Sequence, residues 1–323
     1  MRAVQIVSLD GPSAVEVVDI PQPEPGPEQV LIRVRAAGVS FPEVLQTRGL
    51  YQLKPPLPFV PGSEVAGEVV SAPAGSGLAP GDRVAAMVLL GGFAEYVAVQ
   101  ADTVFPLPDS LSFEEAAAIP LNYLTAHFAL VARGKLAKGE SVLVHGAAGG
   151  VGTASIQVAK AFGAGQVVAV TSTPEKGEFA KAAGADEVVL VDGFKDAVKA
   201  LPSLDGGVDI VVDPVGGDRF TDSLRCLKED GRLLVIGFTA GEIPTVQVNR
   251  LLLNNVSVVG VGWGAYVLKR PGYIREEWDQ LLPHVVSGAI KPPIGATFDL
   301  DDAADALLTL DERRATGKVV LTP

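Results

Sequence analysis

Cysteine and histidine are scarce in this sequence of 323 residues, which contains one cysteine, Cys226, and three histidines. A single cysteine excludes an internal disulfide and fits a reducing compartment, so we expect a cytoplasmic protein. A structural zinc site needs about four thiolate or imidazole ligands, and His127, His145 and His284 are scattered along the chain. The sequence therefore predicts a protein without disulfides and without a structural zinc site.

Basic runs and long apolar runs are also missing. The formal net charge is −12 and the isoelectric point is near 4.8, which argues against nucleic acid or an anionic membrane surface as a main partner. No apolar stretch is long enough to span a bilayer, and Met1–Ile6 lacks the apolar core of a signal peptide. Hydrophobic residues nevertheless make up 48% of the chain, enough for the cores of about two domains.

Residues 1 to about 120 contain short β-like runs separated by proline and glycine. These runs are Ala3–Ser8, Val15–Asp19, Gln29–Ala36, Glu64–Val70, Arg83–Met87 and Ala94–Val99. Proline-rich segments such as Pro21–Pro27 and Pro55–Pro61 fit rigid turns better than flexible linkers. The pattern predicts a compact, barrel-like all-β domain, followed at Ser112–Glu115 by a capping box that begins a helix.

A glycine-rich turn follows an apolar strand within residues 141–163 and leads into a helix that ends at Gly163. Such a turn aims backbone N–H groups and the positive end of a helix dipole at one point, which suits a pyrophosphate. Gly149 allows close approach of the phosphates, and Gly152 allows the helix to pack near the strand. Ala147 stands where the common fingerprint has its first glycine, so a tight strand-to-helix turn without a ligand is the alternative interpretation.

Further apolar strands alternate with helical segments downstream, as in a parallel sheet that is buried on both faces. The strands are Gln166–Ser172, Glu187–Val191, Val208–Val215, Gly231–Phe238 and Val256–Trp263. Together with the strand before the glycine turn they predict a doubly wound parallel-sheet (Rossmann) domain of α/β class.

The rest of the chain predicts helices over Trp278–Val286 and Asp301–Asp311 and a last strand over Gly317–Leu321. We therefore expect a β-rich domain over 1–122, a Rossmann domain over 123–263, and a return segment, 264–323, that packs on the first domain.

The end of the second Rossmann strand indicates the choice of cofactor. Enzymes that prefer NAD place an acidic residue there to accept from the ribose 2′-hydroxyl, whereas this chain has Thr171, Ser172 and Thr173, with Lys176 one helical turn on. Hydroxyls, helix amides and an ammonium suit a 2′-phosphate, so the sequence favours NADPH. The alternative for Lys176 is a solvated lysine on a capped helix.

Motifs recur around the glycine turn in an order that resembles a known family. They are Gly38–Leu45, Arg48–Tyr51, Leu57–Gly67, Gly81–Val84 and Gly317–Val320. The whole chain resembles the medium-chain dehydrogenase/reductase superfamily, in its zinc-free quinone oxidoreductase (zeta-crystallin-like) branch. The resemblance implies a GroES-like N-terminal catalytic domain, a Rossmann NADPH-binding domain, and a homodimer formed through the strand at Val256–Val261.

Zinc-dependent alcohol dehydrogenases of this superfamily hold their catalytic zinc with a cysteine and a Gly-His-Glu motif. This chain has Ser40 at or next to the first position and Ser63 before Glu64 at the second. We therefore expect a metal-free site, with Glu64 as a structural ion-pair or hydrogen-bond partner.

The resemblance places the nicotinamide at the cleft between the domains, and each candidate residue there has a structural alternative. Tyr51 matches a tyrosine that contacts the cofactor, or packs at a turn. Ser40 binds the nicotinamide ribose, or is a turn hydroxyl. Trp263 shapes the substrate pocket, or packs in the core or a dimer interface. Lys318 reaches a phosphate, or faces solvent.

Asn122 and Thr125 line this cleft in relatives, or cap a helix. Tyr51 and Ser40 are the candidate catalytic residues. The full set expected to contact NADPH is Ser40, Tyr51, Asn122, Thr125, Ala148, Gly149, Gly150, Val151, Ser172, Lys176, Phe238, Gly262, Trp263 and Lys318.

Hydride transfer to a quinone fits such a site, because the cofactor supplies the reactive atom and the protein positions it. Water or the Tyr51 hydroxyl then supplies the proton. The main hypothesis is an NADPH-dependent quinone oxidoreductase with a small-molecule quinone or enone substrate. The first alternative is reduction of an α,β-unsaturated carbonyl, either an enone or an enoyl thioester. The second is an NADPH-binding structural or RNA-associated protein without turnover.

Overall fold

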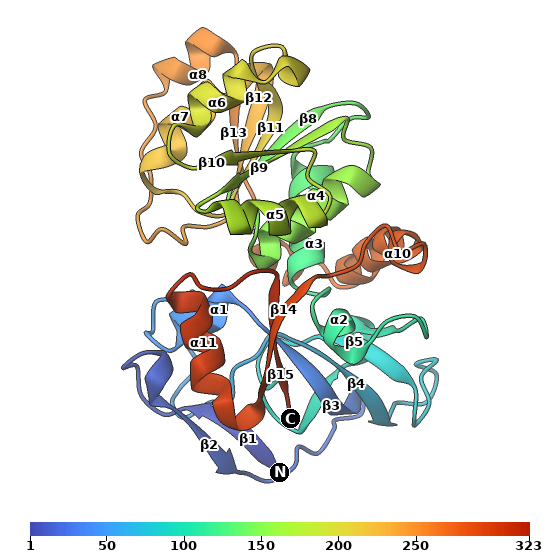
Figure 1. Ribbon diagram of the computed structural model, residues 1–323. Coiled ribbons are helices and arrows are strands. Elements are labelled where there is room, and N and C mark those ends of the chain that lie inside the picture. The colour runs from blue at the N-terminus through green and yellow to red at the C-terminus, as the bar shows by residue number, and fades with distance from the viewer. The chain divides into compact units, whose positions relative to one another are not determined.

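The computed structural model describes all residues, 1–323, and the chain folds into two compact units (Figure 1). The first unit comprises residues 1–122, 271–282 and 292–323, and the second comprises 123–270 and 283–291. The expected return segment 264–323 is thus divided between the units. Tyr266 packs on Phe128 and His284 packs on Phe162, each with ring centroids 4.8 Å apart, and these contacts keep 264–270 and 283–291 in the second unit.

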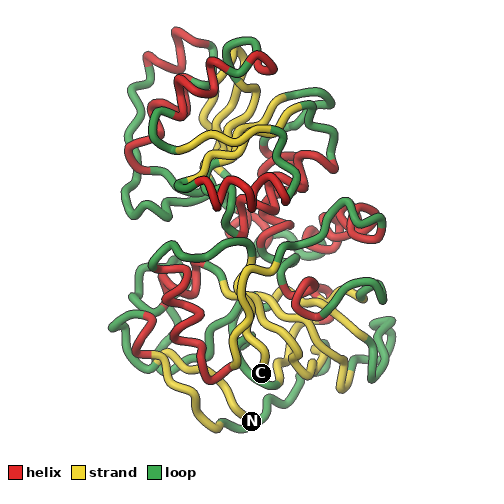
Figure 2. The backbone as a smooth tube through the Cα atoms, viewed as in Figure 1, coloured by secondary structure: helices red, strands yellow, loops and turns green.

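The first unit is built on a seven-stranded sheet with the order β14-β15-β3-β4-β5-β7, in which β6 pairs with β3, and on a separate β1-β2 pair. Figure 2 shows the strands of both units in yellow. The strands are β1 Arg2–Ile6, β2 Val15–Asp19, β3 Gln29–Val39, β4 Glu64–Ser71, β5 Arg83–Met87, β6 Tyr96–Gln100, β7 Val104–Pro106, β14 Ile294–Asp299 and β15 Lys318–Thr322. Buried valines and alanines of these strands form its core, which confirms the predicted β-rich domain.

Helices of the first unit are short except at the C-terminal end. They are α1 Phe41–Gln46, α2 Phe113–Ala117, α11 Ala303–Asp311 and α10 Tyr273–Val286, whose last turn belongs to the second unit. The predicted capping box begins α2, because Glu115 N donates to Ser112 Oγ at 3.2 Å and Ser112 N donates to Glu115 Oε2 at 3.1 Å. Trp278 of α10 is buried and stacks on Phe105 at 4.4 Å between centroids.

The second unit contains a six-stranded, all-parallel sheet with the order β10-β9-β8-β11-β12-β13 (Figure 1). Its strands are β8 Ser141–Val144, β9 Gln166–Thr171, β10 Glu187–Leu190, β11 Val208–Asp213, β12 Leu227–Val235 and β13 Ser257–Gly260. Its helices are α3 Asn122–His127, a π-helix at Phe128–Arg133, α4 Gly150–Ala161, α5 Pro174–Ala182, α6 Phe194–Ala200, α7 Phe220–Arg225, α8 Asn249–Asn254 and α9 Trp263–Val267. This strand order is that of the doubly wound dinucleotide-binding fold, as predicted.

The fifth strand of this sheet differs from the expected range. β12 begins at Leu227 and ends at Val235, so Phe238 lies beyond the strand and is 37% exposed. Its pairing with β11 shifts register between Val208 and Ile210, and within β12 Asp230 has a positive φ of 62°. No helix of the chain is both long and apolar enough to cross a membrane.

Candidate active site

The glycine turn lies at the carboxyl end of β8 and leads into α4. Gly146 has a φ of +58°, and a Cβ on Gly152 would lie 2.1 Å from Gly146 O, so only glycine lets α4 approach the turn this closely. Ala147 is buried and donates its N–H to Val170 O at 3.3 Å. Its methyl group therefore fits where the common fingerprint has glycine.

The N-terminus of α4 has the properties that a pyrophosphate requires. The first N–H groups of a helix have no acceptor inside it, and Gly149 at the N-cap has no side chain to provide one. The nearest atom to a Cβ on Gly149 would be Gly146 O, at 3.4 Å. Gly149 N donates to Gly146 O at 2.9 Å, so the predicted run Ala148–Val151 presents the amides of Ala148, Gly150 and Val151 at the positive end of a helix dipole, an arrangement that fits a dinucleotide.

The carboxyl end of β11, beside β8 in the sheet, adds a group that the sequence reasoning missed. Asp213 is 1% exposed, and its Oδ1 accepts from Val215 N and Gly216 N, each at 2.9 Å. Its Oδ2 is buried without a hydrogen-bond partner. Burial raises the pKa of this carboxyl group. A hydroxyl of a bound ligand would satisfy this oxygen.

At the end of β9, the expected hydroxyl-rich turn is present. Thr173 caps α5 by accepting from Lys176 N at 3.3 Å, and Pro174 is the first helical residue. Ser172 is exposed. Glu175, which the sequence reasoning overlooked, lies in the same first turn. It places a negative charge near the residues expected to bind a 2′-phosphate.

A buried polar cluster forms in the first unit around the start of α1. Ser40, the N-cap of α1, donates its backbone N–H to Glu43 Oε2 at 2.9 Å, and Ser63 Oγ donates to Glu43 Oε1 at 2.6 Å. Both serines are at most 9% exposed and Glu43 is fully buried. Each oxygen of the Glu43 carboxyl group is thus engaged by a donor of the chain.

Lys318 and Glu64 form the second half of this cluster. The Lys318 ammonium donates to Glu64 Oε1 and, at 2.6 Å, to Ser40 Oγ, while Glu64 Oε2 accepts from Leu121 N at 2.7 Å. Glu64 is an ion-pair partner, as predicted. Lys318 is only 3% exposed, so the expectation that it faces solvent is wrong. β15 carries its ammonium into the unit, where it contacts Ser40 and Glu64.

Burial controls the charge state of this cluster. Burial raises the pKa of Glu43 to about 7, against the opposing effects of the Ser63 hydrogen bond and the Lys318 charge. Tyr51 is partly buried, and burial followed by the charge of Glu43 raises the pKa of its phenol. Glu43 was missed from the sequence, although the serine-to-glutamate spacing of a capping box at 40–43 would have indicated it.

The other predicted residues lie at element ends of the second unit or at its boundary. Asn122 is buried and begins α3, and Thr125 follows in the same helix. Gly262 is the N-cap of α9, and Trp263, its first residue, is 4% exposed. His145 follows β8, and its Nε2 lies 2.8 Å from Ser223 Oγ. Burial lowers its pKa to about 3, so this histidine is a neutral structural residue, as expected.

A dinucleotide turn on a six-stranded parallel sheet, joined to a β-rich unit, defines an oxidoreductase of the dehydrogenase type. Residues 26–109 match the alcohol dehydrogenase GroES-like domain, and residues 150–287 match the family described as zinc-binding dehydrogenase. The mouse (Mus musculus) quinone oxidoreductase-like protein 2 is 38% identical over 99% of this chain and 92% of its own length.

Solved structures agree with this assignment. A probable oxidoreductase from Mycobacterium abscessus has 45% identity and a TM-score of 0.91, with 100% of this chain and 99% of that chain covered. The quinone oxidoreductase from Thermus thermophilus, also solved with NADPH, has 38% identity and a TM-score of 0.86, with both chains fully covered. The chain therefore belongs to the medium-chain dehydrogenase/reductase superfamily, among its quinone oxidoreductase-like members.

The family description names zinc, but the residues present do not fit this ion. No group of three or more histidine, cysteine, aspartate or glutamate side chains is arranged to hold a metal. Hydroxyls stand at Ser40 and Ser63, and Glu64 is already paired with the Lys318 ammonium. The single cysteine, Cys226, is buried at the end of α7 in the second unit. No step of the chemistry below passes through zinc.

Proposed function

We propose that this protein is an NADPH-dependent quinone oxidoreductase that transfers hydride without a metal ion. The observation that carries the proposal is the buried ion pair of Lys318 and Glu64. It places an ammonium group next to the glutamate of the zinc motif. The chain nevertheless keeps the glycine turn of the dinucleotide fold. The relative from Thermus thermophilus, a quinone oxidoreductase solved with NADPH, supports this combination.

The cofactor is proposed to lie across the carboxyl ends of β8, β9 and β11. The amides of Ala148, Gly150 and Val151 bind the pyrophosphate, Gly149 lets it approach the backbone closely, and Ser172 with Lys176 binds the 2′-phosphate. The nicotinamide half contacts the remaining members of the predicted set, which are Ser40, Tyr51, Asn122, Thr125, Phe238, Gly262 and Trp263. Lys318 contributes by holding Ser40.

When bound, NADPH supplies a hydride to the acceptor, and the protein has to position both and deliver a proton. Tyr51 is the proposed donor of that proton to the quinone oxygen, with water as the alternative source. Burial and the charge of Glu43 raise the pKa of the Tyr51 phenol, so the phenol stays protonated at neutral pH. Tyr51→Phe should therefore lower kcat for a quinone while the Kd for NADPH stays close to that of the wild type; an unchanged kcat would assign the proton to water.

An NADPH-oxidation assay with three acceptors tests the proposed activity. A quinone, a 2-enone and an enoyl thioester are compared by kcat/KM, and the quinone should be the best substrate. A clear preference for the enone or the thioester would replace the proposal by reduction of α,β-unsaturated carbonyls. Tight NADPH binding without turnover of any acceptor would indicate a structural protein, for which the acidity of the chain argues against an RNA partner.

A further inference from the structure

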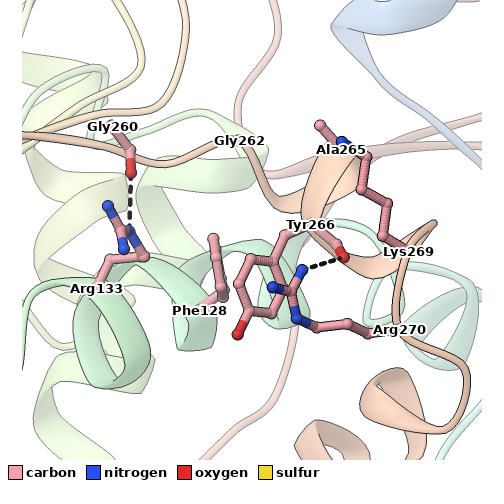
Figure 3. Close-up of a pocket in the computed structure, with 8 residues that line it drawn as sticks. All are labelled: Phe128, Arg133, Gly260, Gly262, Ala265, Tyr266, Lys269 and Arg270. Atoms are coloured by element: carbon pink, nitrogen blue, oxygen red, sulfur yellow. Dashed lines mark hydrogen bonds between the residues drawn. The ribbon is translucent and has the colours of Figure 1, made fainter.

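A cavity of about 390 Å³ lies in the second unit, between the π-helix, the end of β13 and α9. Phe128 and Tyr266 form its aromatic part, with ring centroids 4.8 Å apart. In Figure 3, Arg133 lies on one side of this pair and Arg270 on the other. The Arg270 guanidinium carbon lies 3.7 Å from the centroid of the Tyr266 ring, so a planar cation is stacked on the aromatic face.

The lining of this cavity is basic in a chain whose net charge is −12. Arg133, Lys269 and Arg270 line it, and no aspartate or glutamate does. Six arginines elsewhere pair with carboxylates, namely Arg2, Arg35, Arg48, Arg225, Arg232 and Arg314, whereas Arg83 and Arg275 donate to backbone carbonyls. The three cations of the cavity have no carboxylate among its lining residues to neutralise them.

Backbone carbonyls, rather than carboxylates, hold the two guanidinium groups. Arg133 Nε donates to Gly260 O at 2.9 Å, and Arg270 Nη1 donates to Tyr266 O at 3.2 Å. Each bond uses one of the five N–H donors of a guanidinium, so most donors stay available for an anion in a fixed fork geometry. Fixed arginine forks match the oxygens of a phosphate.

The cavity shares Gly262 with the residues proposed to contact the nicotinamide half of the cofactor, but it is separate from the places where the cofactor phosphates are proposed to bind. It adjoins β13, an edge strand, whereas the glycine turn follows β8, and β11 and β12 lie between these strands. At a spacing of about 4.8 Å between strands, the carboxyl ends of β8 and β13 are about 14 Å apart. β9, which precedes Ser172, is one strand further away.

We propose that this cavity binds the phosphate group of a small molecule. The phosphate is carried either by the acceptor, as in an enoyl thioester of coenzyme A, or by a separate phosphorylated compound. The same contacts between arginine and phosphate would recognise either compound. Only the first possibility, in which the acceptor carries the phosphate, rests on the proposed reductase function.

Calorimetric titration with inorganic pyrophosphate tests the site in the full chain with NADP⁺ at saturation. Arg133→Gln and Arg270→Gln should each weaken pyrophosphate binding about tenfold, and added KCl should weaken it further. Lys199→Gln, an exposed charge on α6, is the matched control and should bind like the wild type. Circular dichroism and the Tm show that each variant is folded.

Three results would overturn the proposal: no binding to the wild type, an equal loss in Lys199→Gln, or displacement of pyrophosphate by NADP⁺, which would assign the cations to the cofactor.

The source of the phosphate is resolved by KM values for crotonyl-coenzyme A and 2-cyclohexenone in Arg270→Gln. A rise confined to the thioester assigns the phosphate to the acceptor, and unchanged values assign it to a separate compound. If no acceptor is reduced, the proposed reductase function is refuted. The pyrophosphate titration then tests by itself whether the cavity binds phosphate.

Discussion

The carboxyl group of Glu43 has two donors of the chain on its oxygens and no exposed surface. Two buried carboxylates, Glu43 and Glu64, share a single ammonium, that of Lys318, and it lies against Glu64. Burial therefore prevails over hydrogen bonding at Glu43 and brings its pKa to about 7. Ionisation of this carboxyl group therefore costs stability.

Glu43→Gln should change how stability depends on pH. A carboxyl group whose pKa rises from 4.5 to about 7 on folding contributes stability that is complete below pH 4.5 and lost as the pH rises through about 7. The loss amounts to about 3 kcal/mol, and the variant should not show it. Urea unfolding at about pH 5 and about pH 8 measures this, with the exposed Glu24→Gln as control. Parallel pH profiles for Glu43→Gln and the wild type would contradict the expectation.

We propose that residues at the start of α5 decide the cofactor preference. Lys176→Ala should weaken NADPH binding roughly tenfold, about 1.4 kcal/mol, and the loss stays this small because Lys176 is partly exposed. NADH binding should be nearly unchanged, because NADH has no 2′-phosphate for this lysine to bind. Ser172→Asp should reverse the preference, since a carboxylate repels the 2′-phosphate and accepts from the NADH hydroxyls. Fluorescence titrations with both cofactors measure these effects, with Lys181→Ala in the last turn of α5 as control.

Equal losses of both cofactors in Lys176→Ala would show that this residue acts through the stability of α5 instead. Wild-type protein that prefers NADH would place the selectivity elsewhere. Glu175, in the same turn, is then the first residue to examine.

Elements with strong local signals could be predicted from the sequence. The first four apolar runs of the parallel sheet and the capping box at Ser112 were located closely, because periodicity and capping are local properties. The last two runs were not: β12 begins at Leu227 instead of Gly231, and the expected strand Val256–Trp263 ends at Gly260, with Trp263 as the first residue of α9. β7 and β14 were missed: the first is three residues long, and the second is extended by pairing with β15, a contact with the last strand of the chain. The Lys318–Glu64 pair was missed for the same reason, since 254 residues separate its partners.

The glycine turn was predicted from the same kind of local signal, and Gly152→Ala tests it. Replacing a helical glycine with alanine normally stabilises a helix by up to about 1 kcal/mol. Here the new Cβ would lie 2.1 Å from Gly146 O, so we expect a loss of about 1–3 kcal/mol through overpacking, together with weaker NADPH binding. Gly264→Ala in α9, where a Cβ meets nothing within 4 Å, is the control. Unchanged cofactor binding in Gly152→Ala would argue against the turn as the pyrophosphate site.

At the scale of the whole molecule, the absence of zinc ligands leads to a direct measurement. Purified protein should contain less than a stoichiometric amount of zinc and keep its activity after treatment with a chelator, because serines stand where the metal motif requires cysteine and histidine. Elemental analysis before and after chelation measures this. One tightly held zinc per chain, lost together with activity, would overturn the metal-free mechanism.

The cytoplasmic location stays a prediction.

The second unit has an open sheet edge at β13, and we propose that two copies of the chain pair there to form a homodimer. β13 pairs with β12 alone in this sheet, and an uncovered edge strand is a template for a second copy. The segment just before it exposes large apolar side chains, with Leu252 and Leu253 of α8 at 76% and 75%, as expected of a surface that a partner covers. Light scattering should therefore give the mass of a dimer.

A double change, Leu252→Asp with Leu253→Asp, should shift this dimer toward monomer, because it places charges in the apolar patch. Leu50→Asp, an exposed leucine of the first unit at 67%, should leave the mass unchanged. A wild-type monomer at all concentrations would refute pairing through β13. A dimer that persists in the double variant would remove α8 from the interface and leave the strand edge itself as the contact.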